Sequence, residues 1–174
     1  MSPRFISSAL AVVLLLSASG TLRAAEDSKE KAASATEEDG KHFDADGNPT
    51  FKIENGVVDW YTFNGYRRYH ADCHVCHGPD GEGSSYAPAL AKTMINLDYG
   101  TFLSIVAEGR KSVVGGKEVV MPAFGENKNV YCYLDDIYIY LRARAVGAAP
   151  RGRPPKKADK PEAATAYETS CMGG

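Results

Sequence analysis

The chain has 174 residues and four cysteines, with 20 basic and 22 acidic side chains and a net charge of −2. This length suits one domain rather than two, and the near-neutral balance excludes the strongly basic surface typical of nucleic-acid-binding proteins. Nothing after the N-terminal leader is apolar for long enough to cross a bilayer. We therefore expect one soluble domain with no nucleic-acid partner and no membrane insertion.

Residues 1–24 have the composition of a secretory signal peptide. Arg4 gives a positive start, "ALAVVLLL" (Ala9–Leu16) forms a short apolar core, and small residues precede "EDSKE". The apolar core is too short to span a membrane as a mature helix. The sequence thus predicts an exported protein whose leader is removed after Ala24 or Ala25.

Residues 25–49 form an acidic N-terminal segment that we expect to be disordered. Glu26–Gly40 consists mainly of Ala, Glu, Lys and Ser, so it has almost no apolar side chain to bury. "FDADGNP" (Phe43–Pro49) carries calcium-like oxygen ligands, but proline stands where the EF-hand loop needs glycine. An ordinary surface turn is therefore the favoured interpretation of this stretch.

Residues 50–146 are expected to form the folded domain, preceded within that range by a hairpin. In "TFKIENGVVDW" (Thr50–Trp60), two short β-prone runs flank Asn55-Gly56, a good hairpin turn. Apolar periodicity then predicts three helices: one from about Tyr61 through Cys73, one over Asp98–Arg110, and one from Asp135 to Val146. The acidic start of the last helix suits its positive N-terminal end.

The C-terminal segment, residues 147–174, differs in composition from the domain before it. "GAAPRGRPPKKADKP" (Gly147–Pro161) is rich in proline and basic residues. Such a composition is typical of a linker or of an arm that wraps a surface.

The most specific motif is "HADCHVCHG" (His70–Gly78). A structural zinc site needs about four ligands, and the other two cysteines are single; a thioredoxin-like dithiol needs a βαβ setting, which is missing. Cys-x-x-Cys-His is the attachment signature of c-type haem. It predicts one covalently bound haem c, with thioethers from Cys73 and Cys76 and an iron ligand from His77. Haem attachment of this kind occurs outside the cytoplasm, in agreement with export.

A second iron ligand is expected from a methionine. Met94 reads as a core residue, and Met172 lies two residues from the C-terminus. Met121 lies in "VVMPAFG", where Pro122 favours an extended loop and Phe124 can pack beside a ring. We therefore expect Met121 to be the ligand opposite His77, with a buried, non-ligating methionine as the alternative. Two protein ligands would leave the iron no open position, so we expect an electron carrier without catalytic residues.

From about Val57 to Ala145 the chain resembles the small, mainly α-helical monohaem cytochromes c with His/Met ligation. The matching features are a glycine and an aromatic residue before the motif, an apolar stripe on the last helix, and a proline after the motif; these residues are Gly65, Tyr69, Ile137, Tyr140, Leu141 and Pro88. The resemblance implies that the carbonyl of Pro88 receives the ring N–H of His77 and fixes the imidazole. The N-terminal hairpin-bearing extension and the C-terminal Pro-rich arm would be additions to this fold.

A narrower resemblance covers most of the mature chain. "VDWYTFNGYRRYHADCHVCHGPDGEGSSYAPAL", "MPAFGENKNVYCYLDDIYIYLRARA" and the late cysteine are similar to the four-cysteine cytochromes of methanol metabolism. These are cytochrome c-L-like electron acceptors of PQQ-dependent methanol dehydrogenase, especially of the lanthanide-dependent type. The resemblance implies a periplasmic carrier that takes single electrons from that dehydrogenase and passes them to a downstream cytochrome c or oxidase. A shuttle for another exported dehydrogenase or terminal oxidase is the alternative.

The remaining cysteines, Cys132 and Cys171, form an even pair in an oxidising compartment once haem has used the other two. This predicts a disulfide that fastens the C-terminal arm, and the four-cysteine pattern of the family supports it. The competing interpretation is a buried free Cys132, with Cys171 free or linked between molecules.

Overall fold

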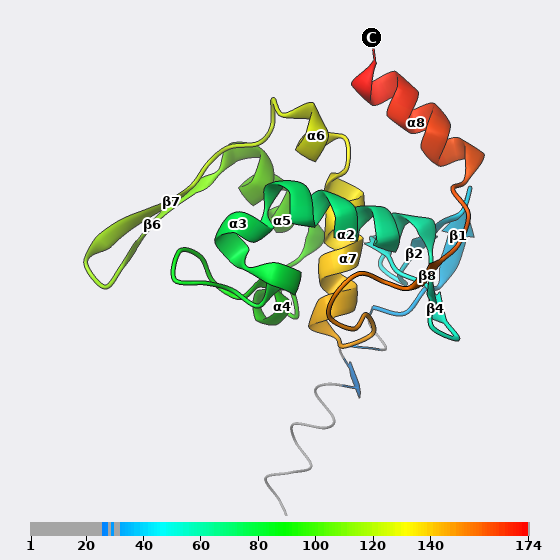
Figure 1. Cartoon of the computed structure of the whole chain (residues 1–174), viewed down its shortest axis with the longest axis horizontal. Coiled ribbons are helices and arrows are strands. Elements are labelled where there is room, and N and C mark those ends of the chain that lie inside the picture. The colour runs from blue at the N-terminus through cyan, green and yellow to red at the C-terminus, as the bar shows by residue number, and fades with distance from the viewer. Residues whose placement is uncertain (1–25, 28, 30–31, 174) are drawn as a thin grey trace, which may run out of the picture.

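The computed structural model describes Glu26, Asp27, Lys29 and residues 32–173 (Figure 1). The predicted signal peptide over residues 1–24 lies outside these residues. Within the described part of the chain, no helix is both long enough and apolar enough to cross a membrane.

Two long helices cross at the centre of the molecule, α2 (Trp60–Asp72) and α7 (Leu134–Ala145) (Figure 1). Asp59 begins α2 by accepting a hydrogen bond from the backbone N–H of Thr62, which satisfies one of the free donors of the first turn. At the crossing, a Cβ added to Gly65 would lie 1.8 Å from the carbonyl oxygen of Asp136. Only glycine permits this approach, and the predicted first and third helices are confirmed.

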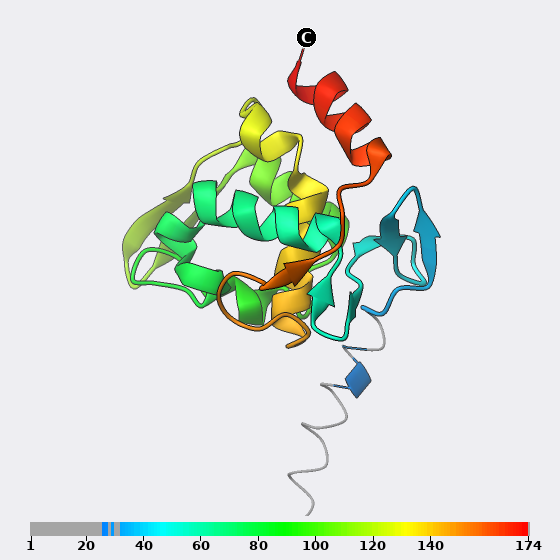
Figure 2. The same cartoon turned by 45° about the vertical axis from the view of Figure 1, so that its right-hand side comes forward.

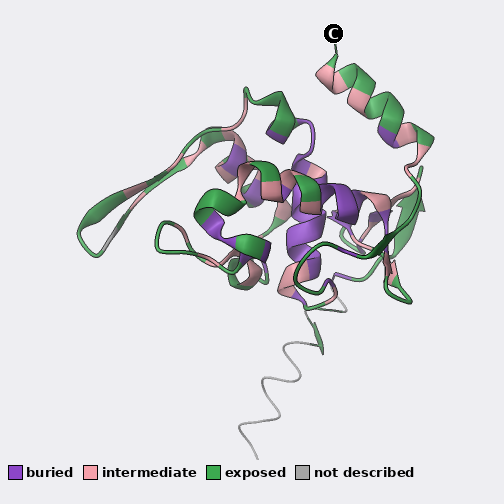
Figure 3. Cartoon of the chain, in the orientation of Figure 1, coloured by how far each residue is buried: buried purple, intermediate pink, exposed green. Residues whose placement is uncertain are grey.

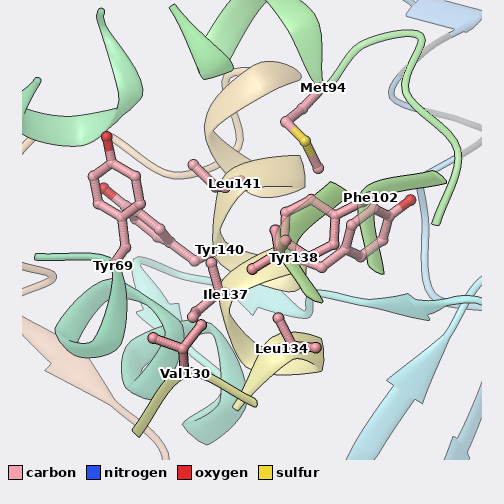
Figure 4. Packing of buried hydrophobic residues seen from close by; sticks show 10 residues of the cluster. Tyr69, Met94, Phe102, Val130, Leu134, Ile137, Tyr138, Tyr140 and Leu141 are labelled. Atoms are coloured by element: carbon pink, nitrogen blue, oxygen red, sulfur yellow. The ribbon is translucent and has the colours of Figure 1, made fainter. Parts of the chain in front are cut away.

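The main core is built around α7 (Figure 4). Phe102 from α5 (Tyr99–Glu108) and Met94, which follows α4 (Leu90–Thr93), belong to the same buried cluster as Tyr138. The full set of buried side chains is Tyr69, Met94, Phe102, Val106, Val130, Leu134, Ile137, Tyr138, Tyr140 and Leu141. The buried Arg142 donates to the carbonyl oxygen of Met94 at 2.6 Å and so ties the end of α4 to α7.

The N-terminal segment contains a three-stranded antiparallel sheet of β1 (Thr36–Glu38), β2 (Lys41–Phe43) and β3 (Pro49–Thr50). The prediction of disorder over residues 25–49 is therefore wrong for residues 36–49. The composition gave few apolar side chains to bury, but distant contacts hold the sheet in place. Lys41 forms a 2.8 Å ion pair with Asp135 on α7, a partner that local composition does not reveal.

Two turns follow in this region. Asp44 organises the β2–β3 turn, because its Oδ1 accepts the backbone N–H of Asn48 at 2.9 Å. The predicted hairpin is confirmed: β4 (Ile53–Glu54) pairs antiparallel with β5 (Val57–Val58). Its turn requires a left-handed backbone, which Asn55 adopts with φ of 52°.

A second hairpin was not predicted. The helix expected over Asp98–Arg110 ends at Glu108, and β6 (Arg110–Val114) then pairs antiparallel with β7 (Lys117–Met121). The hairpin extends away from the helices, and its outer end is exposed (Figures 1 and 3). It carries Met121 at its base, so it brings the predicted methionine back to the body of the protein.

The C-terminal arm wraps the surface rather than hanging free (Figure 2). Within it, β8 (Lys156–Lys157) pairs parallel with β5 beside the start of α2. Lys157 places its ammonium 5.0 Å from the centre of the Trp60 ring, a favourable cation–π contact. The arm ends in α8 (Glu162–Met172), a helix that was not predicted.

A disulfide joins Cys132 to Cys171 and so fixes α8 to the domain. Cys132 is buried and follows α6 (Lys128–Tyr131), directly before α7. The predicted pairing is thus confirmed, and the alternative of a free Cys132, with Cys171 free or linked between molecules, is wrong.

Candidate haem-binding site

The Cys-x-x-Cys-His motif lies where α2 ends and the short helix α3 (His74–His77) begins. Cys73 terminates α2, with its backbone N–H donating to Tyr69 at 2.9 Å. Its carbonyl oxygen accepts the backbone N–H of Cys76 at 3.2 Å and that of His77 at 3.0 Å. One helical turn therefore presents both thiols and the imidazole from a single rigid segment.

The ring of His77 is buried, and a hydrogen bond orients it. Its Nδ1 lies 3.0 Å from the carbonyl oxygen of Pro88. A carbonyl can only accept, so Nδ1 carries the proton and Nε2 is the nitrogen with a free lone pair. The expected Pro88 contact is thus present in the structure, and it leaves the coordinating nitrogen available.

The loop after the motif is tight and anchored. A Cβ on Gly78 would lie 2.2 Å from the carbonyl oxygen of Gly83, and Gly78 itself has a left-handed φ of 73°. The backbone N–H of Gly83 donates to the carbonyl of His77 at 2.7 Å, and the buried Tyr69 hydroxyl donates to the carbonyl of Gly78 at 2.6 Å. The aromatic residue expected before the motif therefore fixes the loop that leaves it.

Met121 ends β7 and is partly buried against the main core. The loop after it is held to the end of α5, since the backbone N–H of Phe124 donates to Val106 at 3.0 Å and that of Gly125 to Ala107 at 3.0 Å. The other two methionines considered as iron ligands lie elsewhere in the structure. Met94 is fully buried within the core (Figure 4), and Met172 ends α8 beside the disulfide.

The residues present fit a covalently attached haem. Several apolar side chains pack against the main core while staying partly exposed, among them Cys73, Leu90, Leu97, Leu103, Met121 and Phe124. Partly exposed apolar side chains suit contact with a large flat apolar ring. Burial, reinforced by the nearby charge of Asp72, raises the pKa of the Cys73 thiol to about 12.

One further residue, Arg144, holds the loop after His77 and had no signal in the sequence. Arg144, on α7, donates from Nε to the backbone oxygen of Asp80 at 3.2 Å and from a terminal nitrogen to Glu82 at 2.7 Å. Both contacts join residues more than sixty positions apart. No local pattern marks these partners, so only the tertiary structure reveals them.

No family model matches the chain. Over 138 residues it is 58% identical to cytochrome c-553I of Paracoccus denitrificans, an alignment that covers 79% of this chain and 61% of that protein. It is also 38% identical over 96 residues to cytochrome c-555 of Methylococcus capsulatus, covering 55% of this chain and 72% of the relative. The chain belongs to the c-type cytochromes.

A solved structure agrees with this assignment. The c-type cytochrome XoxG from Methylobacterium extorquens AM1 is 56% identical and superposes with a TM-score of 0.79, covering 84% of this chain and 90% of that one. The expected cytochrome c fold is therefore confirmed for this c-type cytochrome. It spans less than two thirds of the Paracoccus relative.

Proposed function

We propose that this c-type cytochrome carries one haem c, attached through Cys73 and Cys76 and ligated by His77 and Met121, and that it works as a periplasmic one-electron carrier. The observation that supports this most directly is the environment of the His77 ring. Its ring is buried, its Nδ1 is bound to the Pro88 carbonyl at 3.0 Å, and the same helical turn presents both thiols. A histidine with only a structural role has no need of this combination.

A haem c bound here would accept and release one electron. Cys73 and Cys76 would hold it through thioethers, which prevents its loss. The Pro88 carbonyl keeps the His77 ring in one tautomer and orientation. Met121, at the end of β7 and next to the anchored loop, would be the second protein ligand of the iron. An iron with two protein ligands has no position for a substrate, which supports a carrier rather than an enzyme.

For the electron donor we propose a PQQ-dependent methanol dehydrogenase, and for the acceptor a downstream cytochrome c or oxidase. The support is the resemblance to the four-cysteine cytochromes of methanol metabolism, together with the disulfide between Cys132 and Cys171. A carrier for another exported dehydrogenase or terminal oxidase is the second candidate. The two candidates share the same haem site and differ only in which reduced protein donates quickly.

Two experiments test these proposals in turn. The exported protein should show a c-type visible spectrum; His77→Ala should lose its low-spin character, while His74→Ala, at an exposed position in the same turn, should keep it. The purified cytochrome is then mixed with a PQQ methanol dehydrogenase, methanol and the metal that the enzyme requires. Fast haem reduction that depends on ionic strength is expected. Reduction no faster than by free quinone would refute this donor and favour the second candidate.

A further inference from the structure

Asp80 lies in the loop after the motif, within the short 3₁₀ turn η1 (Pro79–Gly81). It is 5% exposed and has a left-handed φ of 57°. A non-glycine residue in this conformation is unfavourable by itself, so the surrounding contacts must hold it. A buried carboxylate likewise requires partners.

Asp80 has partners from three separate segments. Its Oδ1 accepts the Tyr140 hydroxyl of α7 at 3.2 Å and the backbone N–H of Gly152 of the C-terminal arm at 3.0 Å. Its Oδ2 lies 3.6 Å from Nε of Arg151 on the arm, and its backbone N–H donates to Nε2 of His70 on the last turn of α2 at 3.4 Å. Asp80 therefore joins the loop that leaves His77 to α7 and the arm through its carboxylate and to α2 through its backbone.

Arg144 also joins the loop to the arm, because its side chain donates to backbone carbonyls of both. Besides its bond to the Asp80 carbonyl, it donates to the carbonyl of Ala149, at the start of the arm, at 2.6 Å. Two side chains thus hold the arm to the loop, namely Asp80 from the loop itself and Arg144 from α7. The disulfide fixes the far end of the arm, whereas Asp80 fixes its beginning.

We propose that Asp80 is a positioning residue that couples the C-terminal arm to the loop that follows the His77 ligand, and that its charge lowers the reduction potential of the bound haem. The proposal rests on the proposed haem ligation. Net charge, hydrogen bonding and solvent exposure are the protein's means of setting such a potential. A nearby buried negative charge favours the oxidised, more positive form. The cation of Arg151 offsets part of that charge, so the arm contributes to the potential.

A charge effect of Asp80 and a purely structural effect would shift the reduction potential in opposite directions. Asp80→Asn removes the charge but keeps an acceptor for Tyr140 and Gly152, so the loop should stay closed and the potential should rise. If Asp80 only held the loop, its loss would admit water to the site and lower the potential. Arg151→Gln leaves the carboxylate less compensated, so it should lower the potential by a smaller amount.

Spectroelectrochemistry of the holoprotein tests the charge effect. At a fixed ambient potential, Asp80→Asn should raise the ratio of reduced to oxidised haem about five- to tenfold, where tenfold corresponds to 59 mV for one electron. Asp159→Asn, at an exposed position on the arm, and Arg153→Gln, whose guanidinium stacks 5.1 Å from the Phe63 ring, are the matched controls. Both should leave the ratio within twofold of the parent. A change under twofold for Asp80→Asn, a shift in the other direction, or an equal shift in Asp159→Asn would overturn the proposal.

Amide hydrogen exchange tests the coupling to the arm. Asp80→Ala removes the acceptor of the Gly152 N–H, so this amide should exchange at least tenfold faster, while Asp80→Asn should retain its protection. If Asp80→Ala does not fold, Tyr140→Phe and Arg144→Gln are measured instead, and Arg144→Gln should accelerate the Gly152 amide. Unchanged exchange at Gly152 would refute the coupling. A parent protein without a c-type spectrum would refute the proposed function instead, since exchange at Gly152 is measured without reference to haem.

Discussion

Gly65→Ala is expected to destabilise the protein by about 2–3 kcal/mol, although alanine is the better helix former. The helices α2 and α7 approach most closely at this glycine. An added Cβ would lie 1.8 Å from the carbonyl oxygen of Asp136, 2.5 Å from its carbonyl carbon and 2.8 Å from Cβ of Tyr140. None of these atoms can rotate away, because two belong to the backbone of α7 and the third is attached directly to it.

The magnitude follows from the distance by which the helices must separate. Ordinary contact begins near 3.4 Å, so the new methyl would be about 1.6 Å too close to Asp136. A gap of 0.5–1 Å already costs a quarter to a half of the dispersion energy of each facing atom pair. Overpacking typically costs about 1–3 kcal/mol and sometimes more; with a rigid backbone opposite we expect about 3–4 kcal/mol. The higher helix propensity of alanine offsets roughly 1 kcal/mol of this cost.

Urea unfolding of the holoprotein measures this difference, and Gly100→Ala is the matched control. Gly100 lies in the first turn of α5, where an added Cβ would meet only a side-chain oxygen of Asp98 at 3.6 Å. The same substitution should therefore be neutral or stabilising there, by up to about 1 kcal/mol. A Gly65→Ala variant as stable as the parent would show that the helix crossing is not tight and would refute the reasoning.

Three further predictions concern the ligand, the disulfide and a buried acid. Met121→Ala should abolish the far-red methionine–iron band of the oxidised protein and lower its potential, whereas Met94→Leu should keep the band; the opposite pattern would show that Met94 is the ligand. Replacing both Cys132 and Cys171 by serine opens a bridge across 39 positions and should cost up to about 4 kcal/mol in urea unfolding; a loss below about 1 kcal/mol would contradict this. Burial raises the pKa of Asp136 from 3.8 to about 7. The native state then keeps a proton that the unfolded chain loses, so stability should fall as pH rises from about 4 to 7, by at most about 4 kcal/mol. Asp136→Asn should remove that slope, and an unchanged slope would assign it to another group.

Local sequence patterns were sufficient for much of this structure. The periodicity that placed Gly65, Tyr69 and Cys73 on one helix face depends only on residues within two turns of one another. The turn at Asn55 is likewise determined by the few residues around it, since asparagine tolerates the left-handed conformation. The Cys-x-x-Cys-His spacing is also local, because one helical turn presents all three side chains. The disulfide could be predicted by counting, since only two cysteines were left.

The β6–β7 hairpin and α8 each had a local sequence signal, but that signal alone was not enough to predict the element. Gly115-Gly116 between two valine-rich runs is a hairpin signal, and the β6–β7 hairpin forms there. An isolated hairpin is marginal in water, so the pattern alone did not distinguish it from a loop. The run after Pro161 has good helix formers, yet α8 buries little of its own surface and is held by the bond from Cys171.

Only the tertiary structure decided the contacts between distant segments. The N-terminal sheet has few apolar side chains of its own, and the Lys41–Asp135 pair spans 94 positions. The Asp80 bond to Gly152 spans 72 positions, and neither residue has a neighbour in sequence that marks it as a partner. The physical reason is that a hydrogen bond or ion pair depends on distance in space, while composition and periodicity report only on residues within a few turns. The sequence by itself therefore determined the Cys-x-x-Cys-His segment and its helices, and the folded chain determined what holds that segment in place.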